Sequence, residues 1–202
     1  MDEARTHERE VKKTLRAASL PEPFFASRYS FSPYMACGHG CAYCDGRAER
    51  YWVEGEFDRD IVVRTNVADR LDHDLSRVRE RAPVAVGSGI SDAYQPVEER
   101  LGLMRPAAGV LLRHRMPASV LTKSSLVVRD LDLWRGVNDA GGSILSVSLV
   151  FADDGLRRIF EPGASPVDGR MAAMLGNPKL AGFLRGVAID RRVFDYVNLR
   201  LE

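Results

Sequence analysis

Short runs of β-branched and small apolar residues alternate with segments of helical periodicity along most of the chain. Such runs, bounded by polar or turn-forming residues, are typical of buried strands. The predicted strands are Tyr29 to Tyr34, Ile61 to Thr65, Val84 to Gly87, Ala118 to Thr122 and Ile144 to Val150. Strands that alternate with helices in this way indicate an α/β fold built on parallel strands.

The helices between these strands are predicted from apolar spacing and from capping residues. Apolar residues recur at helical spacing from Val67 to Arg81 and again from Leu126 to Trp134. Pro96 suits the first position of a further helix, because its missing N–H makes no bond there. Glu98 and Glu99 would then complement the positive end of that helix dipole.

Length and composition are those of one ordinary globular domain. The chain has 202 residues, of which 45% are hydrophobic and 28% charged, and this excludes a disordered tail protein. Its net charge of +1 supplies no field that would hold a polyanion. No apolar run approaches the roughly 20 residues that span a bilayer, and the N-terminal residues are mostly charged. We therefore expect a cytoplasmic protein that does not enter a membrane.

The cysteines lie together in one stretch: Cys37, Cys41 and Cys44, spaced C-x3-C-x2-C. An odd number of cysteines in a reducing compartment argues against disulfides. Thiolates this close can turn toward one metal centre, and Gly38 and Gly40 ease the wrapping because glycine tolerates positive φ. A four-iron cubane usually has four cysteine ligands, so this set would leave one iron open to a substrate or cofactor.

Two plainer interpretations stay open for the same stretch. His39 would complete a structural zinc site together with the cysteines, although such sites usually draw their ligands from two separate pairs. The cysteines would otherwise be inert buried thiols, which rarely cluster so tightly.

Polar side chains follow the predicted strands where each strand ends. Ser91 and Asp92 come after the second core strand, Lys123 after the third, and Ser146 and Ser148 lie in the fourth. The loops after parallel strands gather at one face in a barrel. Together they suit an amino-acid zwitterion, because Asp92 or Ser91 can accept from an ammonium while Lys123 and a serine hold a carboxylate.

Several of the polar residues also have a structural interpretation. Asp92 would cap the turn before Pro96, and Lys123 would be an ordinary surface lysine. Glu161-Pro162-Gly163 would end a helix. The arginines of the later segment are predicted to lie on helix surfaces: Arg157, Arg158 and Arg170.

The segment Cys37-Gly-His-Gly-Cys-Ala-Tyr-Cys44 resembles the cluster loop of the radical S-adenosylmethionine superfamily. In that family three cysteines hold a 4Fe-4S cluster, and the amino and carboxyl groups of S-adenosylmethionine chelate the fourth iron. The resemblance implies that Cys37, Cys41 and Cys44 are the cluster ligands and that Tyr43 lies near the adenine.

Further motifs are similar to the spore photoproduct lyase-related branch of that superfamily, and they cover about residues 24 to 175. They are Ser32-Pro-Tyr34, Ser91-Asp-Ala-Tyr-Gln-Pro-Val-Glu98, Leu121-Thr-Lys-Ser124, Arg129-Asp-Leu-Asp-Leu133 and Glu161-Pro-Gly-Ala164. The resemblance implies that Ser91 and Asp92 replace the Gly-Gly-Glu segment that binds the methionine amino group. It further implies that Lys123 binds the carboxylate, assisted by Ser148 or, less favoured, Ser146.

The same resemblance implies a partial TIM-like (β/α) barrel of parallel strands, a radical S-adenosylmethionine core that is incomplete after about the fourth strand. We divide the chain into an N-terminal extension (1–23), the core (24–175) and a divergent C-terminal segment (176–202). Within the last, Phe183 to Ile189 and Phe194 to Leu201 could each be strand or helix. The open sheet edge calls for cover by a C-terminal segment, a partner chain or an oligomer, unless the chain is an impaired descendant of an enzyme.

The resemblance implies an enzyme that cleaves S-adenosylmethionine reductively to a 5'-deoxyadenosyl radical, which acts on an unknown substrate. A one-electron donor, flavodoxin or ferredoxin, is implied as a partner. Authentic spore photoproduct lyases carry a hydrogen-donating cysteine where Ile90 stands here, so DNA is not the expected substrate. The alternative is a non-catalytic metal-binding protein that carries structural zinc or a vestigial cluster.

Overall fold

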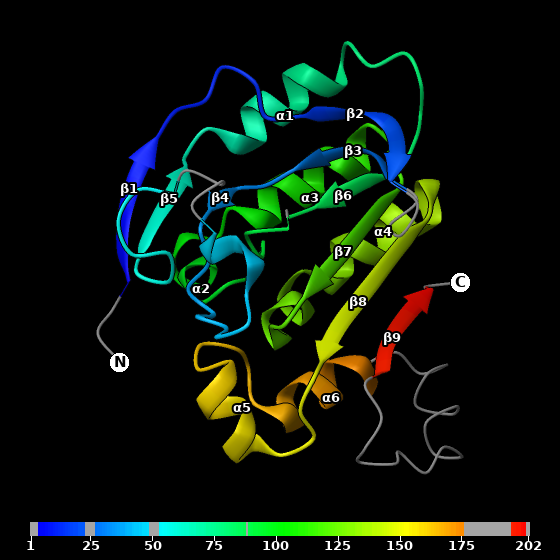
Figure 1. Cartoon of the computed structure of the whole chain (residues 1–202). Helices are drawn as coiled ribbons and strands as arrows, with labels where there is room; N and C mark the ends of the chain where they lie inside the picture. Colours follow the sequence, from blue (N-terminus) through cyan, green and yellow to red (C-terminus); the bar gives the residue numbers. More distant parts are fainter. Residues whose placement is uncertain (1–3, 23–26, 49–52, 88, 176–194, 201–202) are drawn as a thin grey trace.

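A six-stranded sheet forms the centre of the molecule in the computed structural model, which describes residues 4–22, 27–48, 53–87, 89–175 and 195–200. Four inner strands run parallel and follow one another in chain order: β3 (Ser27–Phe31), β6 (Val84–Val86), β7 (Ala118–Thr122) and β8 (Ser143–Leu149). The predicted α/β architecture with parallel strands is confirmed. Over the described residues the sheet is open, and its strands do not close into a barrel (Figure 1).

Both edge strands run antiparallel to their neighbours. The strand β2 (Arg16–Glu22) pairs with β3, and β9 (Asp195–Arg200) pairs with β8 from Ile144 to Leu149. The segment Phe194 to Leu201 therefore contains a strand, and it covers the edge left open after the fourth parallel strand. The other undecided segment, Phe183 to Ile189, lies outside the described residues.

A smaller sheet of order β1-β5-β4 lies beside the first one (Figure 1). It consists of β1 (Arg5–Arg9), β5 (Asp60–Arg64) and β4 (Tyr34–Met35). The single strand predicted from Tyr29 to Tyr34 is therefore wrong, because the chain leaves the larger sheet after Phe31. Pro33 has no N–H for a ladder, and the Ser32 hydroxyl donates instead to the Tyr34 carbonyl at 2.8 Å. The N-terminal extension contributes a strand to each sheet.

The larger helices pack on one face of the six-stranded sheet (Figure 1). They are α1 (Val67–Leu75), α3 (Met104–Arg113) and α4 (Leu131–Gly141). Alternate strand residues such as Val84, Val120 and Leu145 pack against them, together with the fully buried Trp134. Because strand side chains alternate between faces, the residues in between face away from the helices.

The remaining helices lie near the carboxyl ends of the parallel strands. They are η1 (Asp45–Arg47), α2 (Val97–Leu101), η3 (Ser125–Asp130), α5 (Asp154–Phe160) and α6 (Val167–Leu175). The helix predicted from Val67 to Arg81 ends at Leu75, where the Ser76 hydroxyl donates to the His73 carbonyl at 2.8 Å. The helix predicted across Leu126 to Trp134 is divided into η3 and α4.

Glu98 does more than complement a helix dipole. Its buried carboxylate accepts from the amides of Leu103 and Met104 at 3.0 Å each, so it satisfies two of the free N–H groups where α3 begins. The same carboxylate accepts from Arg129 at 2.5 Å and from the Tyr34 hydroxyl. One side chain thus joins two helices, η3 and the smaller sheet.

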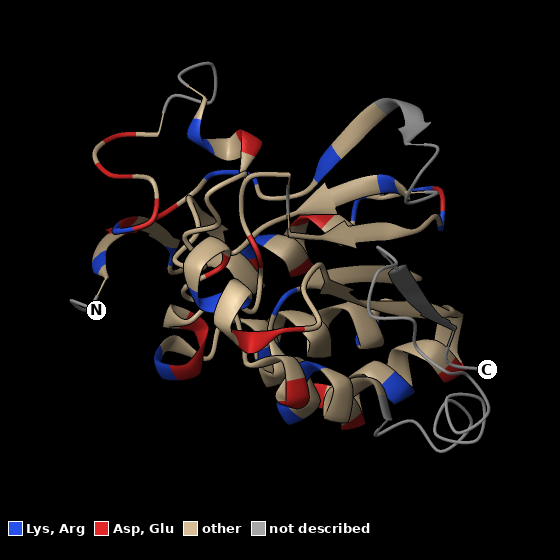
Figure 2. Cartoon of the chain, turned by 60° about the horizontal axis from the view of Figure 1, so that its bottom comes forward, with Lys and Arg blue, Asp and Glu red and all other residues tan. Residues whose placement is uncertain are grey.

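Lys and Arg positions are interspersed with Asp and Glu positions along the ribbon, and neither sign is confined to one part of the described chain (Figure 2). In the part of the chain that the structure describes, no helix has the length and apolar character that crossing a membrane requires.

Candidate functional site

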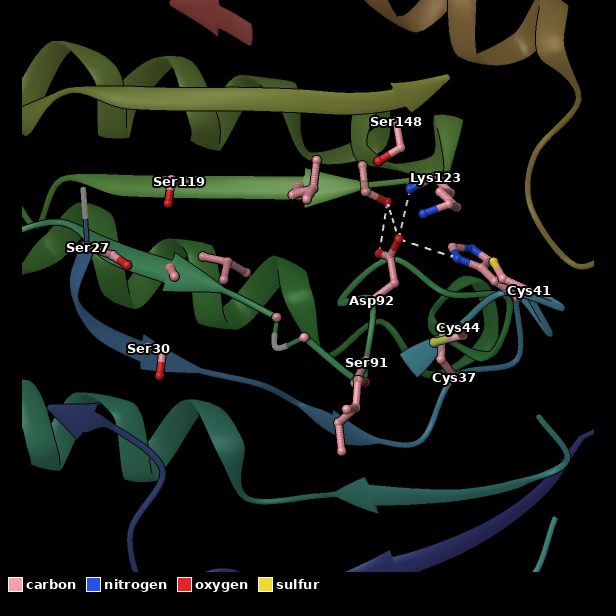
Figure 3. Close-up of a pocket in the computed structure, with 18 of the residues that line it drawn as sticks. Ser27, Ser30, Cys37, Cys41, Cys44, Ser91, Asp92, Ser119, Lys123 and Ser148 are labelled. Atoms are coloured by element: carbon pink, nitrogen blue, oxygen red, sulfur yellow. Dashed lines mark hydrogen bonds and ion pairs between the residues drawn. The ribbon is translucent and has the colours of Figure 1, made fainter. Parts of the chain in front are cut away.

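A cavity of about 460 Å³ opens at the carboxyl ends of the parallel strands and extends along the sheet face that the helices leave free. It brings together side chains from the strands of the larger sheet, from the loop that carries the cysteines and from the segments that follow β6 and β7 (Figure 3). Those predicted from the sequence that line it are Cys37, Cys41, Cys44, Ser91, Asp92, Lys123 and Ser148. Tyr43 and the less favoured serine, Ser146, are not among the lining residues.

The cysteine loop runs between β4 and η1 and wraps through two residues in the left-handed region. Ala36 has φ 69° and Gly40 has φ 64°. The Gly40 amide donates to the Cys37 carbonyl at 3.3 Å, and the Cys44 amide to the Cys41 carbonyl at 3.2 Å. Successive tight turns therefore bring all the thiols to the same cavity, with Cys37 and Cys41 buried and Cys44 partly exposed.

Gln95 and Arg47 hold this loop, and neither was identified from the sequence. The Gln95 amide accepts from the Gly38 N–H at 2.7 Å and donates to the Ala36 carbonyl at 3.0 Å. Arg47 donates to the carbonyls of Gly40 and Cys41 at 3.0 and 3.1 Å. The available signal was that Gln95 follows Ser91 and Asp92 in the same predicted loop.

In the protein without a metal, burial disfavours the thiolate form of Cys37 and Cys41. It raises the pKa of Cys37 to about 12 and that of Cys41 to about 11. A metal centre supplies the positive charge that reverses this penalty, because a coordinating thiol is deprotonated. Among the described residues, no group of three or more His, Cys, Asp or Glu side chains forms a ready-made site for a single metal ion. The cysteines share a cavity without that geometry.

Asp92 joins the loop after β6 to the end of β7. Its carboxylate accepts from the Tyr94 amide at 2.8 Å, from the Thr122 hydroxyl at 2.8 and 3.0 Å, and from the Lys123 amide at 2.8 Å (Figure 3). The bond to the Tyr94 amide shows that Asp92 caps the turn before Pro96, as one interpretation of the sequence had it. A carboxylate accepts at about four positions, so little of its capacity remains for a ligand ammonium.

His39 lies against Asp92, with its Nδ1 at 3.4 Å from a carboxylate oxygen. The imidazole is 2% exposed. Burial lowers the pKa of His39, and the opposing effect of Asp92 is smaller. The neutral imidazole therefore adds no charge to the cavity at neutral pH.

Lys123 extends from the end of β7 across the mouth of the cavity toward Tyr43. Its ammonium lies 5.8 Å from the centre of the Tyr43 ring, within reach of a cation–π interaction. Tyr43 is 49% exposed and donates its hydroxyl to Glu161. Lys123 thus joins the lining of the cavity to the Tyr43 ring beside it.

The prediction that Arg157 and Arg170 are surface charges is wrong. Arg157 is 6% exposed and donates to the carbonyls of Pro162 and Ala164 at 3.1 Å each. Arg170 is fully buried, where it pairs with Glu161 at 3.0 Å and donates to the Ser148 carbonyl at 2.8 Å. Buried charges need such partners, and both partners of Arg170 lie outside its own helix, α6. Arg158 does lie on the surface.

The comparisons with known proteins give relatives without an assigned role. No protein-family model matches the chain, and no solved structure matches it. Uncharacterized proteins of Mycobacterium tuberculosis and Mycobacterium bovis are each 35% identical over 167 residues, 80% of this chain and 47% of the relative. An uncharacterized protein of Methanocaldococcus jannaschii is 29% identical over 126 residues, 62% of this chain and 45% of that protein. The chain therefore spans about half the length of the curated relatives it matches.

Proposed function

We propose that the protein is a radical S-adenosylmethionine iron–sulfur enzyme, related to the spore photoproduct lyase branch, with a substrate still to be identified. The observation that carries this proposal is the gathering of the three cysteines, Lys123 and Ser148 in one cavity at the ends of parallel strands. Such ends are where α/β folds build their active sites.

The sheet supports the partial-barrel part of the proposal. Its parallel strands follow chain order without the reversal that marks a doubly wound sheet. The helices pack on one face and the cavity lies on the other, which is the arrangement of part of a (β/α) barrel.

Cys37, Cys41 and Cys44 would hold a 4Fe-4S cluster through their thiolates. When bound, this cluster would supply the electron that cleaves S-adenosylmethionine to methionine and a 5'-deoxyadenosyl radical. The donor set fits, since the thiols come from one glycine-containing loop and face the same cavity. The burial that raises the pKa of Cys37 and Cys41 would be offset by the positive charge of the iron.

The other predicted residues would bind the methionine part and the adenine. The Lys123 ammonium and the Ser148 hydroxyl would hold the carboxylate, while Ser91, 3% exposed and beside the cysteines, would accept from the ammonium. Asp92 would act as a positioning residue, because its carboxylate fixes the backbone of Lys123. Tyr43 would lie near the adenine, beside the cavity where its ring meets the Lys123 ammonium.

The proposal includes a cytoplasmic location and a partner protein that donates one electron, such as flavodoxin or ferredoxin. It does not include DNA repair, because Ile90 lines the cavity where a hydrogen-donating cysteine would be needed. It includes no partner chain at the β8 edge, since β9 pairs there.

Electron paramagnetic resonance of the anaerobically reconstituted and reduced protein tests the assignment. We expect a reduced-cluster signal that shifts when S-adenosylmethionine is added, because the open iron then gains a ligand. The variant Cys41→Ala should lose the signal and its iron. Wild-type iron content in Cys41→Ala would contradict the cysteine assignment.

Two other outcomes have defined meanings. A cluster signal indifferent to S-adenosylmethionine would contradict cofactor binding and favour a vestigial cluster. A colourless protein with stoichiometric zinc and no iron signal would establish the non-catalytic zinc protein.

A further inference from the structure

Ser119 is a buried side chain on the cavity face of β7 whose hydroxyl has no hydrogen-bond partner among the described residues. The residue is 8% exposed. A buried hydroxyl without a partner costs free energy, so native proteins seldom keep one without a reason. Its neighbours on β7, Ala118 and Val120, face the helices, and Ser119 faces the cavity.

The strand register places a second serine in the same transverse row. Ser30 pairs with Ala85, and Ala85 pairs with Ser119. Adjacent strands lie about 4.8 Å apart, so Ser30 and Ser119 are separated by about 10 Å with only the Ala85 methyl group between them. Both serines line the cavity, as does Ser27. A ligand group could sit over Ala85 with hydroxyls on either side.

This floor lies at the uncharged end of the cavity. Lys123 and Asp92 supply the charged side chains among the described lining residues, and both stand at the cysteine end (Figure 3). Ser119 precedes Lys123 by four residues, or about 13 Å along the strand. An ionised group on the floor would be desolvated without a counter-charge, whereas an amide or hydroxyl would find a partner.

We propose that the floor around Ser119 binds an uncharged, hydrogen-bonding group of the substrate, such as an amide or a hydroxyl. The proposal rests on the proposed function in one respect: S-adenosylmethionine is taken to occupy the cysteine end of the same cavity. A substrate whose recognised part is a phosphate or a carboxylate does not fit this floor.

Acetamide and acetate provide the test, because they have the same shape and differ in charge. Methyl resonances of Ala85 and Leu121, which line the floor, are followed by NMR while each probe is titrated into the purified chain. We expect acetamide to shift them at about tenfold lower concentration than acetate, because only acetate loses its hydration without gaining a counter-charge. An equal or stronger response to acetate, or no response to either probe, overturns the proposal.

Ser119→Ala and Ser143→Ala form a matched pair of hydroxyl deletions. Ser143 faces the other side of the sheet and donates to the Trp134 carbonyl at 3.2 Å. Ser119→Ala should abolish the acetamide preference and leave the melting temperature unchanged or higher. Ser143→Ala should keep the preference and lower the melting temperature. A preference retained in Ser119→Ala, or a fall in its melting temperature equal to that of Ser143→Ala, overturns the proposal.

These measurements need neither iron nor S-adenosylmethionine. If the protein prefers acetamide but forms no cluster, the neutral subsite is supported and the proposed radical enzyme is contradicted. If the cluster signal responds to S-adenosylmethionine but the protein shows no acetamide preference, the radical enzyme is supported and the neutral subsite is contradicted.

Discussion

Gly163 packs so closely against the backbone of Gly38 that a side chain at position 163 would run into the Gly38 carbonyl oxygen. The Gly163 amide donates to the His39 carbonyl at 2.9 Å. The loop after α5 therefore rests directly on the cysteine loop. The Phe160 carbonyl adds to this contact by accepting from the Ala42 amide at 2.8 Å.

Gly163→Ala should disturb the cysteine loop. The new methyl group would meet backbone rather than a flexible side chain, so one of the two loops must move. We expect overpacking to cost about 1–3 kcal/mol, together with reduced iron uptake on reconstitution. Urea unfolding and iron analysis measure the two effects.

Gly109→Ala is the matched control, since a methyl group there, within α3, meets nothing within 4 Å. It should stabilise the protein by about 0.5–1 kcal/mol. Equal stability of the two alanine variants would contradict the close contact.

Asp92→Ala should destabilise the protein although the residue lies in a cavity. It removes the acceptor for the Tyr94 and Lys123 amides and the Thr122 hydroxyl. Groups left without a partner cost about 1–3 kcal/mol. Thr122→Val deletes one of these bonds and should cost less. Denaturant unfolding of both variants measures these costs, and an Asp92→Ala variant as stable as wild type would contradict the structural role of the carboxylate.

Arg170→Met should be among the most damaging single substitutions. Arg170 and Glu161 are fully buried, and removing one partner of such a pair costs about 3–5 kcal/mol because the other charge stays buried. Arg158→Met, at an exposed pair with Asp154, should cost about 0–1 kcal/mol. If the two variants unfold at the same denaturant concentration, the buried pair has no special role.

The double variant Glu161→Leu with Arg170→Met separates a lost attraction from a stranded charge. It removes both charges and should recover part of the stability lost by Arg170→Met alone. Thermal or urea unfolding of the single and double variants completes the cycle.

Asp60 should make the stability of the smaller sheet depend on pH. Hydrogen bonds from Arg5 and His7, at 2.7 and 2.9 Å, and from the Glu56 amide hold the pKa of Asp60 below its usual 3.8. A carboxyl whose pKa is lower in the folded state than in the unfolded state stabilises the folded protein at pH values above the unfolded pKa. This stabilisation is lost as the pH falls from the unfolded pKa through the folded pKa. The melting-temperature difference between wild type and Asp60→Asn should therefore be full near pH 7 and shrink below about pH 4. A difference independent of pH would contradict the role of the charge.

The parts of the fold that follow from local pattern were predicted well. The strand Ala118–Thr122 has the predicted bounds, because turn residues on both sides of a buried apolar run mark where the strand begins and ends. The end of α1 at Leu75 was missed, because apolar residues continue at helical spacing to Val78, beyond the turn that ends the helix. The division of the first strand was also missed, although Pro33 and the break in the alternation at Tyr34 mark it in the sequence.

The cavity residues were identified because chemistry-bearing side chains follow strands, and strand ends meet in space. Their supports were missed. Gln95, Glu161 and Arg170 look like ordinary polar residues in the sequence, and their partners lie on other elements. The position of Gln95 in the loop after Ser91 and Asp92 was a partial signal, whereas the pairing of Arg170 with Glu161 is visible only in the structure.

The strand order also has a consequence for how the chain folds. Ala118 of β7 pairs with Ser143 of β8, 25 residues further along the chain. Tyr29 of β3 pairs with Val84 of β6, and Arg5 of β1 pairs with Asp60 of β5, each across 55 residues. Contacts between distant segments require the closure of a longer loop and form more slowly. The β7–β8 pair should therefore form before β3 and β1 join their neighbours.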